Sequence, residues 1–388
     1  MKSRDISIIG GCGHVGLPLA LKFAEKNFTT YAIDINSEAI NTLNSGKLPY
    51  KEAGGQKLLT KVLKKKKIIF TNDYEKIKKS KYIIITVGTP LNKKNKPDMS
   101  FVFSVIKKIK NYISQSSSII LRSTVFPGTT RKVINFLKAN KIQCKISYCP
   151  ERVAQGKSLE EIQNLTQIIS SEDQQEKKRI EKLFLKICKK TIELSIEEAE
   201  YSKLFSNAWR YIQFGITNEF YTLCENANLN YRKIFYAMKD NYPRNEGLPK
   251  HGFAGGPCLP KDAIQLFYSS EKFSSLAKNA YRVNENLPNF LVNQASKKIN
   301  LKNKNVCVLG TTFKQDIDDE RGSLSIKLIR LLRSRGSKVF IYDPYIKNKS
   351  ELKNILKKCK IIFLGVPHSK FKKLNFKNKL LFNCWGDI

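Results

Sequence analysis

Short apolar runs alternate with amphipathic stretches along the first half of the chain. Six of these runs have the length of buried strands, at residues 5–10, 31–35, 68–71, 82–87, 118–123 and 146–149. The stretches between them, such as 101–112 and 131–138, repeat apolar residues at helical spacing. Apolar strands interleaved with helices indicate a parallel sheet that is covered on both faces.

The pattern changes at Ser195, where a long helical repeat begins and continues to Asn228. Ser195 and Glu198 have the spacing of a capping box, which marks a helix start. Apolar residues then recur at helical spacing, at positions 199, 204, 208, 212, 216, 220 and 223. A helix of this length inside a chain commonly joins two domains and often carries a dimer contact.

The alternation of strands and helices resumes at Asn305. A helix is predicted at 324–335 and strands at 305–310, 338–342, 361–366 and 380–384. The sequence therefore predicts an α/β protein in which two Rossmann-like parallel-sheet domains are joined by a long central helix and a helical middle domain. We expect the domains to span residues 1–192, 193–300 and 301–388.

Lysine and arginine outnumber the acidic residues, and the formal net charge is +37. Such a charge could serve a nucleic acid or an anionic membrane, or it could be spread over solvated faces. The lysines form short separate clusters, as at 64–67 and 370–373, and no nucleic-acid motif accompanies them. This distribution favours the spread charge, so we expect no nucleic-acid partner.

The remaining composition limits location and metal content. No apolar run approaches the roughly 18–20 residues of a membrane span, and the N-terminus lacks the pattern of a signal peptide. A soluble cytoplasmic protein without a membrane partner is expected. The nine cysteines are scattered and form no C-x-x-C pair, which is typical of reduced thiols. The three histidines lie far apart, so no metal site is expected.

A glycine-rich loop follows the first predicted strand and opens a helix. Gly11, Gly13 and Gly16 enclose Cys12, His14 and Val15 in a G-x-G-x-x-G pattern. Such a loop allows a tight turn, close approach of the backbone to a pyrophosphate, and packing of helix on strand. Asp34 ends the second strand, where a carboxylate accepts from the ribose hydroxyls and selects NAD over NADP. Two later strand ends should line the same crevice, with Thr89, Pro90, Ser123 and Thr124.

A second glycine-rich loop, residues 252–262, surrounds a cysteine. Two glycines and a proline precede Cys258, so the backbone is expected to bend and to approach a ligand closely. Pro260 suits the first turn of a helix, which would place Cys258 near the N-cap and Asp262 in the first turn. A helix N-terminus with Lys261 nearby favours the thiolate, which is the nucleophilic form. On the central helix, Lys203 and Asn207 share a face, although spacing alone favours a solvated lysine and a surface amide.

These motifs together resemble the UDP-glucose/GDP-mannose dehydrogenase family of nucleotide-sugar 6-dehydrogenases. The resemblance follows the chain in order, through GCGHVGLP (11–18), STVFPGT (123–129), PERVAQG (150–156), EYSKLFSNAWR (200–210), GFAGGPCLPKD (252–262) and GTTFKQDIDDERGS (310–323). It implies a four-electron oxidation of the C6 alcohol of a UDP-sugar to a carboxylate, with NAD as cofactor and a homodimer as the assembly.

The resemblance also implies roles for individual residues. Cys258 would hold the sugar as a thiohemiacetal and then as a thioester, and Lys203 or a water held by Asp262 would accept the hydroxyl proton. Thr124, Glu151 and Asp262 would position the hydrolytic water, while Lys203 and Asn207 would stabilise oxyanions. The substrate-binding residues would further include Arg152, Val153, Arg210, Arg244, Phe253, Gly255, Lys314 and Arg321.

The identity of the sugar is suggested by departures within the family. Gln155 stands where glucose-specific members usually have a second glutamate, and Pro-Glu-Arg-Val is similar to the UDP-N-acetylhexosamine branch. Arg210 and Arg244 agree with that branch, in which an arginine reaches the substrate from the neighbouring subunit. Pro257 disagrees, because histidine is frequent there. UDP-N-acetylmannosamine or UDP-N-acetylglucosamine is therefore expected, with UDP-glucose as the alternative.

Two other functions compete with this hypothesis. A β-hydroxyacid dehydrogenase shares the N-terminal fold and a helical lysine, but it uses no cysteine and needs no third domain. A non-catalytic, polyanion-binding Rossmann protein would account for the charge, but it would need no ordered set of Lys203, Asn207, Cys258 and Asp262.

Overall fold

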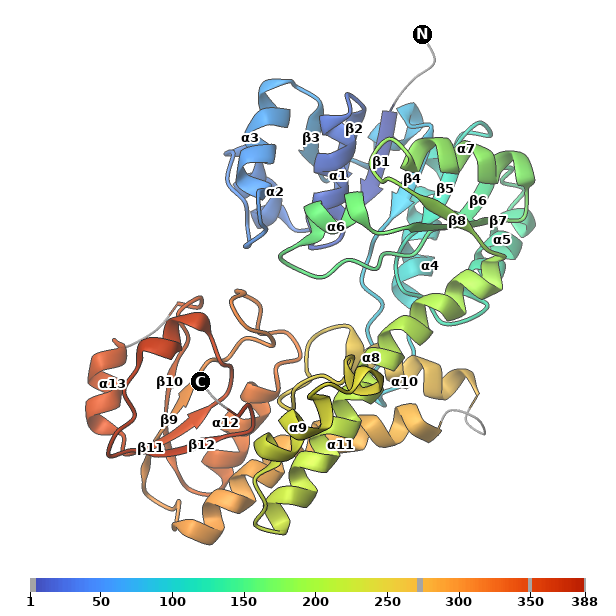
Figure 1. Ribbon diagram of the computed structural model, residues 1–388. Helices are drawn as coiled ribbons and strands as arrows, with labels where there is room; N and C mark the ends of the chain where they lie inside the picture. The colour runs from blue at the N-terminus through green and yellow to red at the C-terminus, as the bar shows by residue number, and fades with distance from the viewer. Residues whose placement is uncertain (1–4, 271–274, 348–350, 387–388) are drawn as a thin grey trace. The chain divides into compact units, whose positions relative to one another are not determined.

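The computed structural model describes residues 5–270, 275–347 and 351–386. The chain divides into two compact units, with the boundary between Phe205 and Ser206. Each unit contains one sheet, and the long helix α8 (Ile196–Asn226) runs across the boundary (Figure 1).

The sheet of the first unit has eight strands in the order β3-β2-β1-β4-β5-β6-β7-β8. Their bounds are β1 Asp5–Ile9, β2 Thr29–Ile33, β3 Ile68–Thr71, β4 Tyr82–Ile85, β5 Ser118–Leu121, β6 Lys145–Tyr148, β7 Gln167–Ser171 and β8 Thr191–Glu193. The strands β1 to β6 are parallel and have the strand order of a dinucleotide-binding fold. The strand β7, which the apolar pattern did not predict, pairs antiparallel with β6.

Helices cover both faces of this sheet, as the apolar runs predicted. One face packs Ile6 and Ile8 against α1 (Gly16–Glu25), α2 (Ser37–Asn44), α3 (Gly55–Lys64), α6 (Ser158–Asn164) and α7 (Gln174–Phe184). The other face packs Ile9 and Ile83 against α4 (Ser100–Ile109), α5 (Thr129–Ala139) and the short 3-10 helix η1 (Tyr74–Lys79). Alternate residues of one strand therefore serve two cores.

The second unit combines helices with a smaller sheet. Its helices are α9 (Tyr231–Lys239), α10 (Leu259–Ser269), α11 (Ser275–Lys298), α12 (Leu324–Ser334) and α13 (Leu352–Lys358). Its strands are all parallel, in the order β10 (Lys338–Tyr342), β9 (Asn305–Leu309), β11 (Ile361–Leu364) and β12 (Leu380–Asn383). Short 3-10 helices occur at Lys110–Tyr112, Pro243–Asn245 and Ser369–Lys373.

The start of α8 is the capping box that the sequence predicted. The Ser195 N–H donates to Glu198 Oε2 at 2.7 Å, and the Glu198 N–H donates to Ser195 Oγ at 3.2 Å. In the described part of the chain, no helix is both long and apolar enough to cross a membrane.

Candidate active site

The glycine-rich loop closes tightly onto the first sheet. A Cβ at Gly11 would lie 2.6 Å from the Ile8 carbonyl oxygen, and one at Gly16 would lie 2.2 Å from the Gly10 carbonyl oxygen. These two glycines are therefore needed by the fold. Gly13 differs, because a Cβ there would meet only the Gly10 oxygen, at 3.4 Å. The open space at Gly13, beside the N-terminus of α1, fits close approach of a pyrophosphate, and His14 and Val15 complete the turn.

Asp34 follows β2 and faces this loop. Its Oδ2 accepts from the Cys12 N–H at 3.0 Å, and its Oδ1 accepts from the N–H groups of Ile35 and Asn36. These bonds fix the carboxylate at the edge where a ribose would bind. The neighbouring Ile35 is 79% exposed, although it is apolar. Sequence reasoning did not select Ile35, which offers an apolar surface beside the Asp34 carboxylate.

The loops after β4 and β5 are joined by their hydroxyl groups. The Thr89 hydroxyl donates to the Thr124 carbonyl, and Ser123 Oγ donates to the Val87 carbonyl at 2.6 Å. Both hydroxyl-bearing side chains are buried, whereas Pro90 is exposed. Thr89 and Ser123 therefore hold two strand ends together at the carboxyl edge of the sheet.

Glu151 lies beside a buried arginine that sequence reasoning did not select. Arg122 is 2% exposed, and its Nε donates to Glu151 Oε2 at 2.9 Å, with a second bond from Nη2. Arg122 Nη1 also donates to the Cys149 carbonyl and to Gln167 Oε1. The other carboxylate oxygen of Glu151 accepts from the N–H groups of Arg152 and Val153, at 2.7 and 3.0 Å. The Arg152 guanidinium turns to the Thr166 carbonyl.

Cys258 is the N-cap of α10, as predicted, and Asp262 lies in the first turn. Among the nine cysteines, all in the described part of the chain, Cys258 is the exposed one. Asp262 is fully buried. Its Oδ2 accepts from Asn207 Nδ2 and its Oδ1 accepts from Lys261 Nζ, each at 2.5 Å. The amide of Asn207 on α8 is thus oriented by the helix that carries the thiol.

Lys203 lies one turn before Asn207 on α8 and, like Asn207, is buried. The solvated lysine and surface amide that spacing alone favoured are therefore wrong. Arg210, on the same helix, is exposed.

The glycines of the cysteine loop lie in close contact with a neighbouring loop. A Cβ at Gly255 would lie 2.6 Å from the Gly322 oxygen, and one at Gly256 would lie 2.6 Å from the Phe313 ring. The Gly256 N–H donates to the Gly322 carbonyl at 2.9 Å. These glycines therefore admit the 310–323 loop, a contact that the sequence did not indicate. This contact joins two segments that the sequence analysis treated separately.

The start of the cysteine loop is held by α8 and by the end of the chain. Asn218 on α8 donates to the Gly252 carbonyl and accepts from the Gly252 N–H, at 3.0 and 2.8 Å. Phe253 is buried and packs edge-on against Trp385. His251 stacks on Tyr221 with ring centroids 4.7 Å apart. Burial, with a smaller effect of Lys250, lowers the pKa of His251 to about 4.

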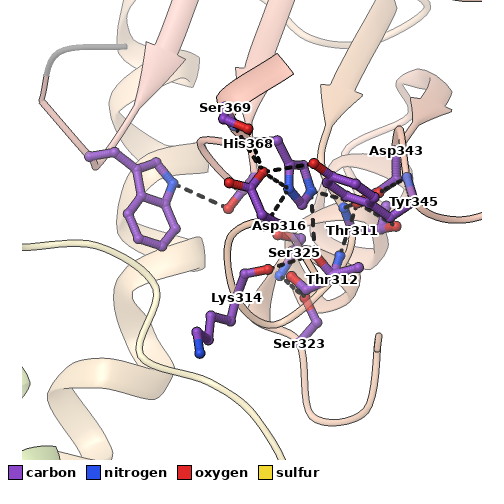
Figure 2. A network of polar contacts seen from close by, with 12 residues as sticks. Thr311, Thr312, Lys314, Asp316, Ser323, Ser325, Asp343, Tyr345, His368 and Ser369 are labelled. Atoms are coloured by element: carbon purple, nitrogen blue, oxygen red, sulfur yellow. Dashed lines mark hydrogen bonds and ion pairs between the residues drawn. The ribbon is translucent and has the colours of Figure 1, made fainter. Parts of the chain in front are cut away.

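A polar network shapes the loop that carries Lys314 (Figure 2). Asp343, which follows β10 and is 1% exposed, accepts from the N–H groups of Thr311 and Thr312 at 2.7 and 3.2 Å. The buried His368 bonds Asp343 Oδ2 through Nε2 at 2.9 Å, and its Nδ1 accepts from the Asp316 N–H at 3.0 Å. Because Nδ1 accepts, Nε2 carries the proton. In Figure 2 the Lys314 side chain extends away from this cluster.

Two further arginines of the predicted site lie on the surface of the second unit. The Arg321 side chain is 59% exposed and forms a two-pronged ion pair with the buried Asp319, with Nη2 2.7 Å from Oδ2. This pair fixes the orientation of the guanidinium. Arg244 is exposed beside Tyr242 in the 3-10 helix Pro243–Asn245.

The predicted residues thus form a group in each unit. The glycine loop, Asp34 and Glu151 lie in the first unit, whereas Cys258, Asp262, Asn207 and the Lys314 loop lie in the second. No group of three or more residues suited to a metal ion occurs within residues 5–270, 275–347 and 351–386.

The order of these motifs matches one known family along the chain. The NAD binding domain of the UDP-glucose/GDP-mannose dehydrogenase family matches residues 4–188, its central domain residues 197–286, and its UDP binding domain residues 307–385. The UDP-N-acetyl-D-mannosamine dehydrogenase of Pyrococcus horikoshii is 30% identical, over 95% of this chain and 90% of the relative.

The chain belongs to the UDP-glucose/GDP-mannose dehydrogenase family.

Relatives of similar sequence identity to this chain act on different UDP-sugars. A UDP-glucose 6-dehydrogenase of Rickettsia bellii is also 30% identical, over 88% of this chain and 81% of the relative. The solved structure of the UDP-D-ManNAc dehydrogenase of Pyrococcus horikoshii has a TM-score of 0.90 at 28% identity, and the match covers 96% of this chain and 91% of that structure. The chain is therefore an oxidoreductase that uses NAD, and its second sheet belongs to a UDP binding domain.

Proposed function

We propose that this dehydrogenase oxidises the C6 alcohol of a UDP-N-acetylhexosamine to the carboxylate, with UDP-N-acetylmannosamine as the first candidate. The observation that carries this proposal is the exposed Cys258 at the N-cap of α10, the helix whose first turn holds Asp262, the buried partner of Asn207. A nucleophilic thiol has no covalent role in an alcohol dehydrogenation that stops at the aldehyde, whereas it allows oxidation to the acid to proceed through a thioester.

The residues of the first unit would hold the cofactor. The open face at Gly13 and the N-terminus of α1 suit its pyrophosphate, and the Asp34 carboxylate suits a ribose without a 2′-phosphate. When bound, NAD supplies the electron acceptor for both oxidations.

The residues around Cys258 would carry the covalent chemistry. The Cys258 sulfur bonds to the carbonyl carbon of the aldehyde, and the carbonyl oxygen gains a proton, which gives a thiohemiacetal. Lys203 accepts the proton of the C6 hydroxyl, directly or through a water held by Asp262. The Asn207 amide, held by Asp262 at 2.5 Å, stabilises negative charge on the C6 oxygen.

Hydrolysis releases the product. Before this, C6 of the thiohemiacetal loses a hydride to the electron acceptor and its hydroxyl loses a proton, which gives the thioester. A water positioned by Asp262, Glu151 and Thr124 then attacks the thioester carbon, the C–S bond breaks, and the Cys258 thiolate takes up a proton. Lys314 and Arg321 bind the diphosphate, for which the Arg321–Asp319 pair already orients the guanidinium. Glu151, Arg152, Val153, Arg210, Phe253 and Gly255 complete the proposed substrate contacts.

We further propose a homodimer through α8. Trp209, Ile216, Phe220 and Leu223 lie at helical spacing on this helix, and each is at least 37% exposed. An apolar stripe of this kind needs a partner. The exposed Arg244 would reach the substrate of the neighbouring protomer. The three functional domains would span 1–192, 193–300 and 301–388.

UDP-glucose is the second candidate, because a UDP-glucose 6-dehydrogenase is as identical to this chain as the mannosamine enzyme is. A panel of UDP-N-acetylmannosamine, UDP-N-acetylglucosamine, UDP-glucose and their galacto forms, read by NADH release, separates the two. We expect two NADH for each N-acetylated sugar oxidised. One NADH with free aldehyde would refute the thioester route, and a preference for UDP-glucose would move the assignment to the second candidate.

A further inference from the structure

The segment between α2 and α3 contacts the glycine-rich loop. We call residues 48–55 the strap. The Tyr50 hydroxyl donates to the Gly13 carbonyl at 3.0 Å, and the Tyr50 ring lies against the His14 ring with centroids 3.9 Å apart. One end of the strap is therefore fixed to the two residues at the open face of the cofactor loop.

The other end of the strap contacts the residues that follow Glu151. Glu52 Oε2 accepts from the Gly156 N–H and from Ser158 Oγ, at 3.2 and 3.1 Å, and its Oε1 accepts from the Leu159 N–H at 3.2 Å. The Ala53 N–H donates to the Gly156 carbonyl at 3.2 Å. Glu52 thus binds the first N–H groups of α6, from a position about a hundred residues earlier in the chain.

The glycine-rich loop and the 150–156 loop also contact each other directly. Gln155 Nε2 lies 3.2 Å from His14 Nδ1, so the amide N–H donates to the imidazole. Burial raises the pKa of Glu52, while its hydrogen bonds to residues 156–159 act in the opposite direction. The carboxylate is therefore partly withdrawn from water and depends on those donors. The glycine loop, the strap and the 150–156 loop form one bonded assembly within the first unit.

We propose that the strap couples cofactor binding to sugar binding, with Tyr50 and Glu52 as positioning residues. The proposal rests on the proposed function, since that function assigns the 150–156 loop to the sugar. A ligand that orders one loop also orders the strap, and through it the other loop. The second ligand then meets a loop that is already in place and binds more tightly.

The test measures NADH binding by fluorescence, with and without saturating UDP-N-acetylmannosamine. The ratio of the two dissociation constants is the coupling factor. For the wild-type protein we expect a factor within the range of about 5 to 150 that is typical of coupled sites. Tyr50→Phe and Glu52→Gln should each reduce the factor, and the direct Gln155–His14 contact carries the coupling that remains. The double variant should lose no more than either single variant, because each change breaks the same connection.

The matched control is Lys47→Ala, an exposed residue just before the strap, which should keep the wild-type factor. Tyr50→Phe removes a single oxygen, so it remains informative if Glu52→Gln folds poorly in thermal unfolding. A factor of one in the wild type, or an unchanged factor in both variants, overturns the coupling. NADH release by the wild-type protein with the sugar panel is measured separately. If no UDP-sugar releases NADH, the proposed function is wrong, whatever the coupling factor.

Discussion

A buried guanidinium limits what Glu151 can do. Arg122 binds one carboxylate oxygen and two backbone N–H groups bind the other, so both oxygens already have donors. The sequence resemblance assigned Glu151 to a water molecule, and its charge does suit that task. The contacts add a second task, which is to fix the bend at Arg152 and Val153. Arg122 was not predicted as a site residue, because a single arginine after a strand belongs to no motif of characteristic spacing.

The Arg122–Glu151 pair should be costly to break. Arg122→Met leaves the Glu151 carboxylate buried without its ion-pair partner, and we expect a loss of about 3–5 kcal/mol in stability of the first unit. Denaturant unfolding measures this loss. The double variant Arg122→Met/Glu151→Met should be less destabilised than Arg122→Met alone. A single-variant loss below about 1 kcal/mol would show that the pair is not structurally important.

Cys258→Ser tests the covalent chemistry. A serine hydroxyl is a far weaker nucleophile than a thiolate, so turnover should fall by a factor on the order of 10³ or more. NAD and UDP-sugar should still bind, because Gly13, Asp34 and Arg321 are untouched. Steady-state NADH release and separate binding titrations measure the two effects. The control is Cys12→Ala, since burial raises the pKa of the Cys12 thiol to about 12 and keeps it inert. Comparable turnover in Cys258→Ser and wild type would contradict the assignment.

Among the elements, those with local signals were predictable. The capping box at Ser195 and the N-cap position of Cys258 follow from side chains within four residues of a helix start. Contacts between loops were not predictable. Gly256 meets Gly322, and Glu52 meets Gly156, without any periodicity that joins these positions. The glycines at 255 and 256 were noticed in the sequence, but their neighbours could only come from the fold.

The buried His251, which directly precedes the cysteine loop, should make the free energy of unfolding depend on pH. The pKa of His251 is about 4 in the folded protein, compared with about 6.5 when the histidine is exposed. The unfolded chain therefore binds a proton that the folded chain does not, and stability should fall as the pH drops from about 6.5 to 4. The full loss is on the order of 3 kcal/mol.

Urea unfolding at pH 7 and pH 4.5 checks this expectation. His251→Phe retains a ring against Tyr221 and should remove this part of the acid sensitivity. If the variant and the wild type lose equal stability over the same interval, His251 is not the cause.

For the whole molecule, the alternation of strands and helices was enough to predict two α/β regions, each with a parallel sheet, and a helical segment between them in the sequence. The antiparallel β7 was not predicted, because a buried strand has the same apolar pattern in either direction. The assignments of catalytic residues came from motif order, since the helical spacing of Lys203 and Asn207 had favoured an exposed pair. Their burial is a property of the folded chain.

The assembly can be tested on the α8 stripe. The double variant Trp209→Glu/Leu223→Glu places two charges on this surface and should convert a dimer into monomers, with a large loss of turnover if Arg244 acts across the interface. Light scattering gives the mass and NADH release gives the activity. Phe101→Glu changes an exposed aromatic residue on α4 and serves as the control. A fully active monomeric wild type would remove both claims, whereas a monomeric variant with full turnover would remove only the cross-protomer role of Arg244.

The two sheets each place an aspartate after a neighbour of their first strand, and the two aspartates have diverged. Asp34 binds the Cys12 N–H and lies at the edge of its loop, whereas Asp343 is enclosed by Thr311, Thr312 and His368. The first sheet therefore keeps its carboxylate at a loop edge, where a bound ligand can reach it, whereas the second uses its carboxylate to hold its own loop together. A ligand of the second sheet must then be bound by other groups of that loop, because the Asp343 carboxylate is already occupied.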